Sequence, residues 1–243
     1  MPAGVTPELM CNWDWMVGRI AEFKPWFKSG TTNAYHTLVW GWIVGEVVRR
    51  TDPAVRPLGK FVQEEICQPL GIEDLYLGIP PSEIGRVSPV LMDAEPVQPP
   101  DQLRQAALPL EVFPAPSVHN RHDVWQACLP SAGVIMNARS GARFFAMLAG
   151  GGEFKGVRLL SEKRIRSFLQ LRDDPYIEDI VLQKVELIGG GGYWIGIYSP
   201  YTSSAVYQNP NIIYHPGAGG SIGWADLDSG LSVAICHNRM HGP

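Results

Sequence analysis

The chain has 243 residues, of which 45% are hydrophobic and 18% charged, and its formal net charge is −4 with a pI near 5.9. These values are typical of a globular protein with a sizeable core, and the acidic balance argues against a nucleic-acid partner. No apolar run approaches the ~20 residues that a membrane-spanning helix needs, so we expect no membrane span.

Three helices are predicted in the region 12–80. In the first of them, residues 12–23, apolar side chains recur at i, i+3, i+4 and i+7 behind Asn12, a suitable N-cap. The second, LVWGWIVGEVVRR (38–50), ends in two arginines, where cations favour the helix dipole. The third, LGKFVQEEICQPLG (58–71), is ended by a proline and a glycine.

The middle of the chain is less regular. Seven prolines lie between residues 89 and 116, so we expect residues 81–130 to form an extended excursion over the surface. Helices return in residues 131–172, where Asn137 and Ser161 are suitable N-caps.

Residues 180–240 have the pattern of an antiparallel sheet. Short β-branched or aromatic runs are separated there by turn residues. These runs are DIVLQKVEL (179–187), GYWIGIY (192–198), NIIYH (211–215), GSIGWADL (220–227) and GLSVAICH (230–237). The last two are predicted to form a hairpin. Helices first and an antiparallel sheet last predict an α+β fold.

The four cysteines lie far apart, without the paired spacing of a zinc site. We therefore expect free thiols, no metal and no cofactor. The first ten residues, MPAGVTPELM, lack the basic and apolar regions of a secretory signal, which favours an intracellular location.

The letters G-G-S-I-G fit the G-x-S-x-G nucleophile elbow of α/β-hydrolases, with Ser221 as the nucleophile. Asp226 or Asp228, followed by His237 or His241, would complete that family's chain order. An elbow lies on a strand-to-helix turn, however, whereas the pattern after Ser221 predicts strand, turn and strand. We therefore favour glycines at a strand end and keep the elbow as a minor alternative.

Three segments, in this order, closely resemble the β-lactamase-related serine hydrolases, which include class C β-lactamases, D,D-peptidases and family VIII esterases. They are YHTLVWGWIVGEVVRR (35–50), EEICQPLGIEDLYLGIP (64–80) and HPGAGGSIGWADLDSGL (215–231). The resemblance implies a fold like that of β-lactamases and penicillin-binding proteins. It also implies a small-molecule ester or amide substrate, cleaved through an acyl-enzyme.

Three motifs line the cleft in that family: Ser-x-x-Lys, a tyrosine often in Tyr-x-Asn, and Lys-Thr-Gly or His-x-Gly on an edge strand. By resemblance, Tyr35 is the general base, His215 and Gly217 fill the third motif, and the Ala218 N–H donates to the oxyanion hole. A phenol with a pKa near 10 needs a cationic neighbour to act as a base at pH 7. His215 would either supply that charge or orient the tyrosine.

The resemblance places four more residues at or near the cleft. Gly219 belongs to the third-motif region, and Ser221 follows it closely. His36 and Thr37 follow the tyrosine, with Thr37 standing where asparagine is common. These four are candidate cleft residues.

No serine in this sequence is followed three residues later by a lysine. We therefore expect the Ser-x-x-Lys portion to lie upstream of Asn12 in the family fold, so that residues 1–243 form a single partial domain that is inactive alone. The alternative is a non-catalytic β-lactamase-like binding or scaffold module, for example within a multidomain protein. Without the missing portion, the apolar runs 38–45 and 231–236 would lack partners, which predicts self-association.

Overall fold

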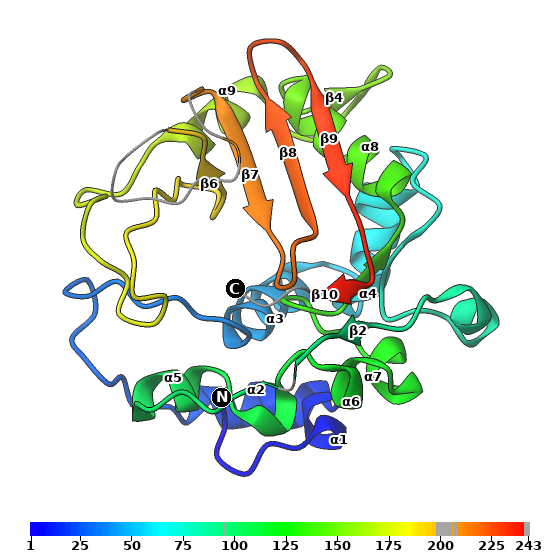
Figure 1. Ribbon diagram of the computed structural model, residues 1–243. Coiled ribbons are helices and arrows are strands. Elements are labelled where there is room, and N and C mark those ends of the chain that lie inside the picture. Colours follow the sequence, from blue (N-terminus) through cyan, green and yellow to red (C-terminus); the bar gives the residue numbers. More distant parts are fainter. Residues whose placement is uncertain (95, 198–205, 207–208, 241–243) are drawn as a thin grey trace.

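The computed structural model describes residues 1–94, 96–197, 206 and 209–240, and it combines a helical region with an antiparallel sheet (Figure 1). The sheet has the order β6-β7-β8-β9, and all of its pairs are antiparallel. Its strands are β6 (Trp194–Ile195), β7 (Ile212–Pro216), β8 (Ile222–Asp226) and β9 (Ser232–Ile235). The predicted α+β class is therefore confirmed, and the predicted hairpin is the β8–β9 pair.

The three predicted N-terminal helices are present. α2 (Trp13–Ala21) begins where the Asn12 side chain accepts a hydrogen bond from the Trp15 N–H at 3.0 Å. α3 (Val39–Thr51) is the longest of the three. The third begins as α4 (Leu58–Val62) and continues as a π-helical turn, η1 (Gln63–Cys67). A further short helix, α1 (Pro7–Met10), precedes them.

Residues 81–130 are more regular than their prolines predicted. Two of the short helices have proline in the first turn, where a missing N–H costs nothing and the fixed φ favours a helix. Another begins behind Asp101, whose side chain accepts the Arg104 N–H at 2.8 Å. The helices are η2 (Pro81–Arg86), α5 (Gln102–Ala107), η3 (Leu110–Val112), α6 (Pro116–His119) and α7 (His122–Gln126).

The first two predicted strands of the last third need correction. Residues 179–187 form only isolated bridges, because the Asp179 carboxylate accepts the Val181 and Leu182 N–H groups and closes a turn. In the run 192–198 only Trp194 and Ile195 are assigned to a strand, and residue 198 lies outside the described part.

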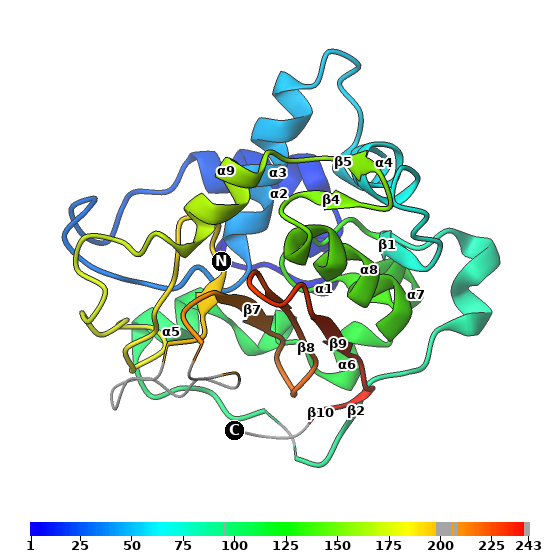
Figure 2. The ribbon, with the colours of Figure 1, turned by 90° about the horizontal axis from the view of Figure 1, so that it is seen from above.

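The helix α8 (Ala138–Ala149) covers one face of the sheet and contacts β8 and β9, as Figure 2 shows from above. The approach is close because Gly223 in β8 has no side chain: a Cβ there would lie 2.0 Å from Phe145 Cε2. Asn137 caps this helix as predicted, and Ser161 caps the short helix α9 (Glu162–Arg166), which continues as η4 (Ser167–Leu169).

Three two-stranded pairs complete the described elements. They are β1 (Leu75–Leu77) with β3 (Val134–Met136), β4 (Glu153–Phe154) with β5 (Val157–Arg158), and β2 (Leu91–Met92) with β10 (Arg239–Met240).

Two main hydrophobic clusters hold these elements together. One joins α8, α9 and the α8 face of the sheet, and it contains Phe145, Leu148, Ile165, Ile213 and Ala225. The other joins the N-terminal helices to the short helices of the excursion, and it contains Met10, Met16, Trp42, Val112 and Val118. Among the described residues, no helix is both long and apolar enough to cross a membrane.

Candidate active site

The third-motif candidates lie at the end of β7 and in the turn that follows it. His215 pairs with Gly223 of β8, and both residues are near the end of the β7–β8 ladder. The turn closes when the Gly217 N–H donates to the Ser221 carbonyl at 2.6 Å and the Gly220 N–H donates to the Gly217 carbonyl at 3.1 Å. Two N–H groups of the turn are therefore used within it.

Ala218 lies in the same turn and is exposed. Its N–H has no hydrogen-bond acceptor among the described residues. Gly219 follows with φ +85°, a left-handed conformation that favours glycine. A Cβ added at Gly219 would lie only 2.6 Å from Met240 Cγ. The Ala218 N–H is thus available to a ligand in the turn that follows His215.

Burial is the main influence on the His215 imidazole. It lowers the pKa of His215, while a backbone hydrogen bond at Pro216 acts weakly in the opposite sense. The indole ring of Trp194 lies 6.1 Å from the imidazole, measured between ring centroids. At neutral pH this histidine is therefore uncharged, so it can accept or donate one hydrogen bond but supplies no positive charge.

Tyr35 lies in the segment that leads into α3, and it is half-buried. Burial raises the pKa of the Tyr35 phenol, and the negative charge of Asp179 raises it further. Asp179 is held beside this segment because the Ile180 N–H donates to the Asn33 carbonyl at 3.0 Å. The described surroundings therefore keep Tyr35 protonated at neutral pH.

Residues 179–194 connect the two candidates. At one end the negative charge of Asp179 acts on the Tyr35 phenol, and the Asp179 N–H donates to the Lys184 carbonyl at 2.9 Å. The Lys184 ammonium lies 5.3 Å from the Trp194 ring centroid and 2.6 Å from the carboxylate of the buried Glu186. Trp194 in turn contacts His215. Residues 179–194 thus approach both Tyr35 and His215, although no hydrogen bond joins the two candidates in the part of the chain described.

This connection was not predicted from the sequence. Residues 179–187 were expected to be a plain strand, and no motif distinguishes Asp179 or Lys184 from other charged residues. Trp194 lies in a run that predicted only a strand. A single sequence carries no signal that could have identified these contacts.

Ser221 does not have the geometry of a nucleophile elbow. It leads directly into the strand β8, and its hydroxyl accepts the His237 N–H at 3.3 Å. Asp226 is at the opposite end of β8, roughly 17 Å away at about 3.4 Å per residue. The Asp226 carboxylate closes the β8–β9 turn by accepting hydrogen bonds from the Asp228 N–H and from Ser229.

The other members of the proposed elbow triad are no better placed. His237 Nδ1 lies 2.6 Å from the Arg239 carbonyl oxygen. Asp228 accepts a hydrogen bond from the Asn211 amide at 2.7 Å. His241 lies outside the described residues. The structure therefore offers no Ser221-centred triad among the residues it describes.

His36 and Thr37 follow Tyr35 along the chain. The His36 side chain is exposed and that of Thr37 is half-buried. No His, Cys, Asp or Glu cluster with the composition of a metal site occurs within the described ranges.

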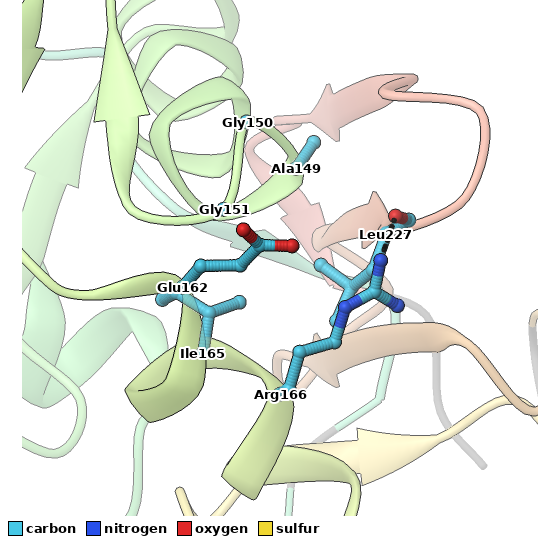
Figure 3. A pocket seen from close by; sticks show the side chains of 7 residues that line it. All are labelled: Ala149, Gly150, Gly151, Glu162, Ile165, Arg166 and Leu227. Carbon is cyan, nitrogen blue, oxygen red and sulfur yellow. Dashed lines mark hydrogen bonds between the residues drawn. The ribbon is translucent and has the colours of Figure 1, made fainter.

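One cavity lies away from these residues. It has a volume of about 190 Å³ and lies between α8, α9 and the β8–β9 turn, where Glu162 and Arg166 face each other across it (Figure 3). Arg166 donates to the Leu227 carbonyl at 3.1 Å, which places the cavity at the end of β8 remote from Ser221. It is therefore separate from the candidate site.

Comparison with known proteins identifies relatives over nearly the whole chain. A family model described as Beta-lactamase matches residues 2–243. The esterase/beta-lactamase LipL of Mycobacterium tuberculosis (strain ATCC 25618 / H37Rv) is 27% identical over 99% of this chain and 56% of its own length.

Two solved structures are similar to the described fold. A family VIII carboxylesterase is 28% identical with a TM-score of 0.83, over 98% of this chain and 61% of its own. A penicillin-binding protein homologue from Caulobacter crescentus is 28% identical with a TM-score of 0.81, over 99% of this chain and 62% of its own. The chain thus spans about three-fifths of the length of these proteins.

Proposed function

This chain belongs to the β-lactamase family, and on that premise we propose that it carries the tyrosine and third-motif half of a serine-hydrolase site for ester or amide acyl transfer. The observation that supports the proposal is that residues 179–194 approach both candidates, since the charge of Asp179 acts on the Tyr35 phenol and the Trp194 ring lies beside His215. The nucleophilic serine would come from a Ser-x-x-Lys segment, which this sequence does not contain.

In the proposed reaction the supplied serine oxygen attacks the substrate carbonyl carbon, and the serine proton passes to the phenolate of Tyr35. The Ala218 N–H donates to the oxyanion that forms. The tyrosine then returns the proton to the leaving group as the bond from carbon to that group breaks. Attack by water, with the same tyrosine as base, releases the acid and restores the serine.

Tyr35 cannot accept the serine proton in the first step without help from another group. Its pKa is raised by burial and by Asp179, so deprotonation requires a positive charge close to the phenol. A neutral His215 does not supply that charge, which favours the orienting role for this residue. The lysine of a Ser-x-x-Lys segment has the required charge. The nucleophilic serine and the lysine that makes Tyr35 a base would therefore be supplied by the same segment.

A chain that lacks the nucleophile should be close to inert, because removing a catalytic serine costs about 10⁶ in turnover in a serine protease. The proposal is tested by fusing this chain to the Ser-x-x-Lys portion of a family VIII carboxylesterase and assaying p-nitrophenyl butyrate. We expect the fusion to hydrolyse the ester and Tyr35→Phe to abolish turnover. Hydrolysis that survives Tyr35→Phe in a folded fusion would overturn the assignment of the base.

The second candidate function is a non-catalytic binding or scaffold module with the β-lactamase fold. It is favoured by the missing Ser-x-x-Lys motif and by the protonated state of Tyr35. On this account the fusion folds cooperatively but neither hydrolyses p-nitrophenyl butyrate nor becomes acylated by a fluorescent penicillin. Acylation of the supplied serine would exclude the module as the function.

A further inference from the structure

The cavity between the end of α8, the helix α9 and the β8–β9 turn takes no part in the proposed acyl transfer, and none of the candidate catalytic residues lines it (Figure 3). Its volume of about 190 Å³ is roughly six times the ~30 Å³ that one water molecule occupies in the liquid. The cavity therefore has room for a ligand of about six non-hydrogen atoms.

Two opposite charges face each other across this cavity. Glu162 and Arg166 are the first and last residues of α9, and this i, i+4 spacing is the one at which such side chains usually pair. Arg166 is instead directed to the β8–β9 turn, where its Nη2 donates to the Leu227 carbonyl at 3.1 Å and its Nη1 lies 3.6 Å from Asp228 Oδ1. Among the described residues, the Glu162 carboxylate has no hydrogen-bond or ion-pair partner. Both side chains therefore keep hydrogen-bonding capacity for a ligand.

The end of α8 strengthens the separation of charge. This helix of 12 residues ends beside Glu162: Gly151 has φ +65°, and a Cβ there would lie 3.3 Å from Glu162 Cγ. The C-terminal end of a helix carries a partial negative charge and favours cations. The glutamate side of the cavity therefore attracts a positive group, and the Arg166 side attracts a negative group. Ile165, which is 1% exposed, adds apolar surface to the lining.

We propose that this cavity binds a small zwitterion of the α-amino acid class, with the ligand ammonium at Glu162 and the ligand carboxylate at Arg166. A simple anion would be repelled by Glu162, and a simple cation would be repelled by Arg166. A neutral apolar ligand would cover both charges without pairing either of them. Alanine carries both charges and has the size that the cavity accepts. Because both side chains are exposed and screened by solvent, we expect a dissociation constant in the millimolar range.

Saturation-transfer NMR on the full chain tests this site, with alanine, propionate and ethylamine as the probes. Propionate lacks the ammonium and ethylamine lacks the carboxylate, so each should bind at least about tenfold more weakly than alanine. Glu162→Gln and Arg166→Gln should each weaken alanine binding by about tenfold. The control Lys163→Gln changes a charge on the same helix at a residue that does not line the cavity, and it should bind alanine as the wild type does.

Three results would overturn the proposal. The first is the absence of saturable alanine binding at concentrations up to about 50 mM, well above the expected dissociation constant. The second is equal binding of alanine and propionate, because Arg166 would then act as an ordinary anion site. The third is alanine binding that both cavity variants retain. The comparison of the three probes on the unmodified chain decides the question even where a variant does not fold.

Discussion

The indole of Trp194 lies against the imidazole of His215, with 6.1 Å between the ring centroids. The same indole receives the Lys184 ammonium at 5.3 Å from its centroid. Trp194 is 7% exposed, so it removes much of the solvent that would otherwise surround the histidine. This contact couples the protonation of His215 to the packing of residues 179–194.

Replacing Trp194 should therefore change how His215 titrates. In Trp194→Leu the imidazole becomes more exposed, and we expect the pKa of His215 to rise towards its ordinary value of about 6.5. A histidine NMR titration measures this directly. Trp26→Leu is the control, because Trp26 is 64% exposed and its replacement should leave His215 unchanged. An unaltered His215 titration in folded Trp194→Leu would show that burial by the indole is not the cause.

The burial of His119 predicts that the folded protein loses stability in acid. Burial lowers the pKa of His119 from 6.5 to about 4. Between these values the unfolded chain binds a proton that the folded chain does not, so the free energy of unfolding should fall as the pH falls. This residue accounts for a decrease of up to about 3 kcal/mol across that window.

Urea unfolding at several pH values measures the effect of His119. His119→Gln should flatten the decrease between pH 6.5 and 4. His36→Gln, at an exposed histidine, should leave it in place. An equal pH dependence in wild type and His119→Gln would contradict the assignment.

Gly223 should be intolerant of any side chain. Gly223→Ala would place a methyl 2.0 Å from the Phe145 ring, so we expect a loss of about 1–3 kcal/mol from overpacking. Gly18→Ala is the matched control in α2, where nothing lies within 4 Å of the new Cβ, and it should gain up to about 1 kcal/mol from helix propensity. Urea denaturation compares both with wild type. Equal stability of the two variants would refute the close packing of α8 on β8.

Four large apolar residues of α3 are 41–58% exposed, namely Trp40, Ile43, Val44 and Val47. Their exposure predicts that the free chain associates with itself. Exposed contiguous apolar residues favour association in water. Sedimentation velocity should therefore reveal oligomers whose proportion rises with concentration. Val44→Glu with Val47→Glu should shift the distribution towards monomer, whereas Val97→Glu should not. A monodisperse wild-type monomer at every concentration would contradict this prediction.

Local signals in the sequence predicted the regular elements well. Asn12, Asn137 and Ser161 cap helices as predicted, because an N-cap acts through one side chain and an amide three residues on. Short β-branched or aromatic runs between turn residues likewise predicted β7, β8 and β9. The short helices within residues 81–130 were not predicted, because a proline in the first turn of a short helix resembles a proline in a loop.

Tertiary contacts between distant residues could not be predicted in the same way. Residues 179–187 have the β-branched composition of a strand. The Asp179 carboxylate nevertheless turns the chain, because it accepts hydrogen bonds from the N–H groups of Val181 and Leu182. Tyr35 and His215 were named only through a family resemblance. The tryptophan and lysine that connect them depend on packing between residues far apart in the chain.

The proposed acyl transfer requires that the nucleophilic serine be supplied to this chain. The most direct measurement is intact-mass and peptide mapping after treatment with a fluorophosphonate, applied to the free chain and to its fusion with a Ser-x-x-Lys segment. We predict no adduct on the free chain and a single adduct on the supplied serine of the fusion. An adduct on Ser221, or on any other serine of the free chain, would contradict the account.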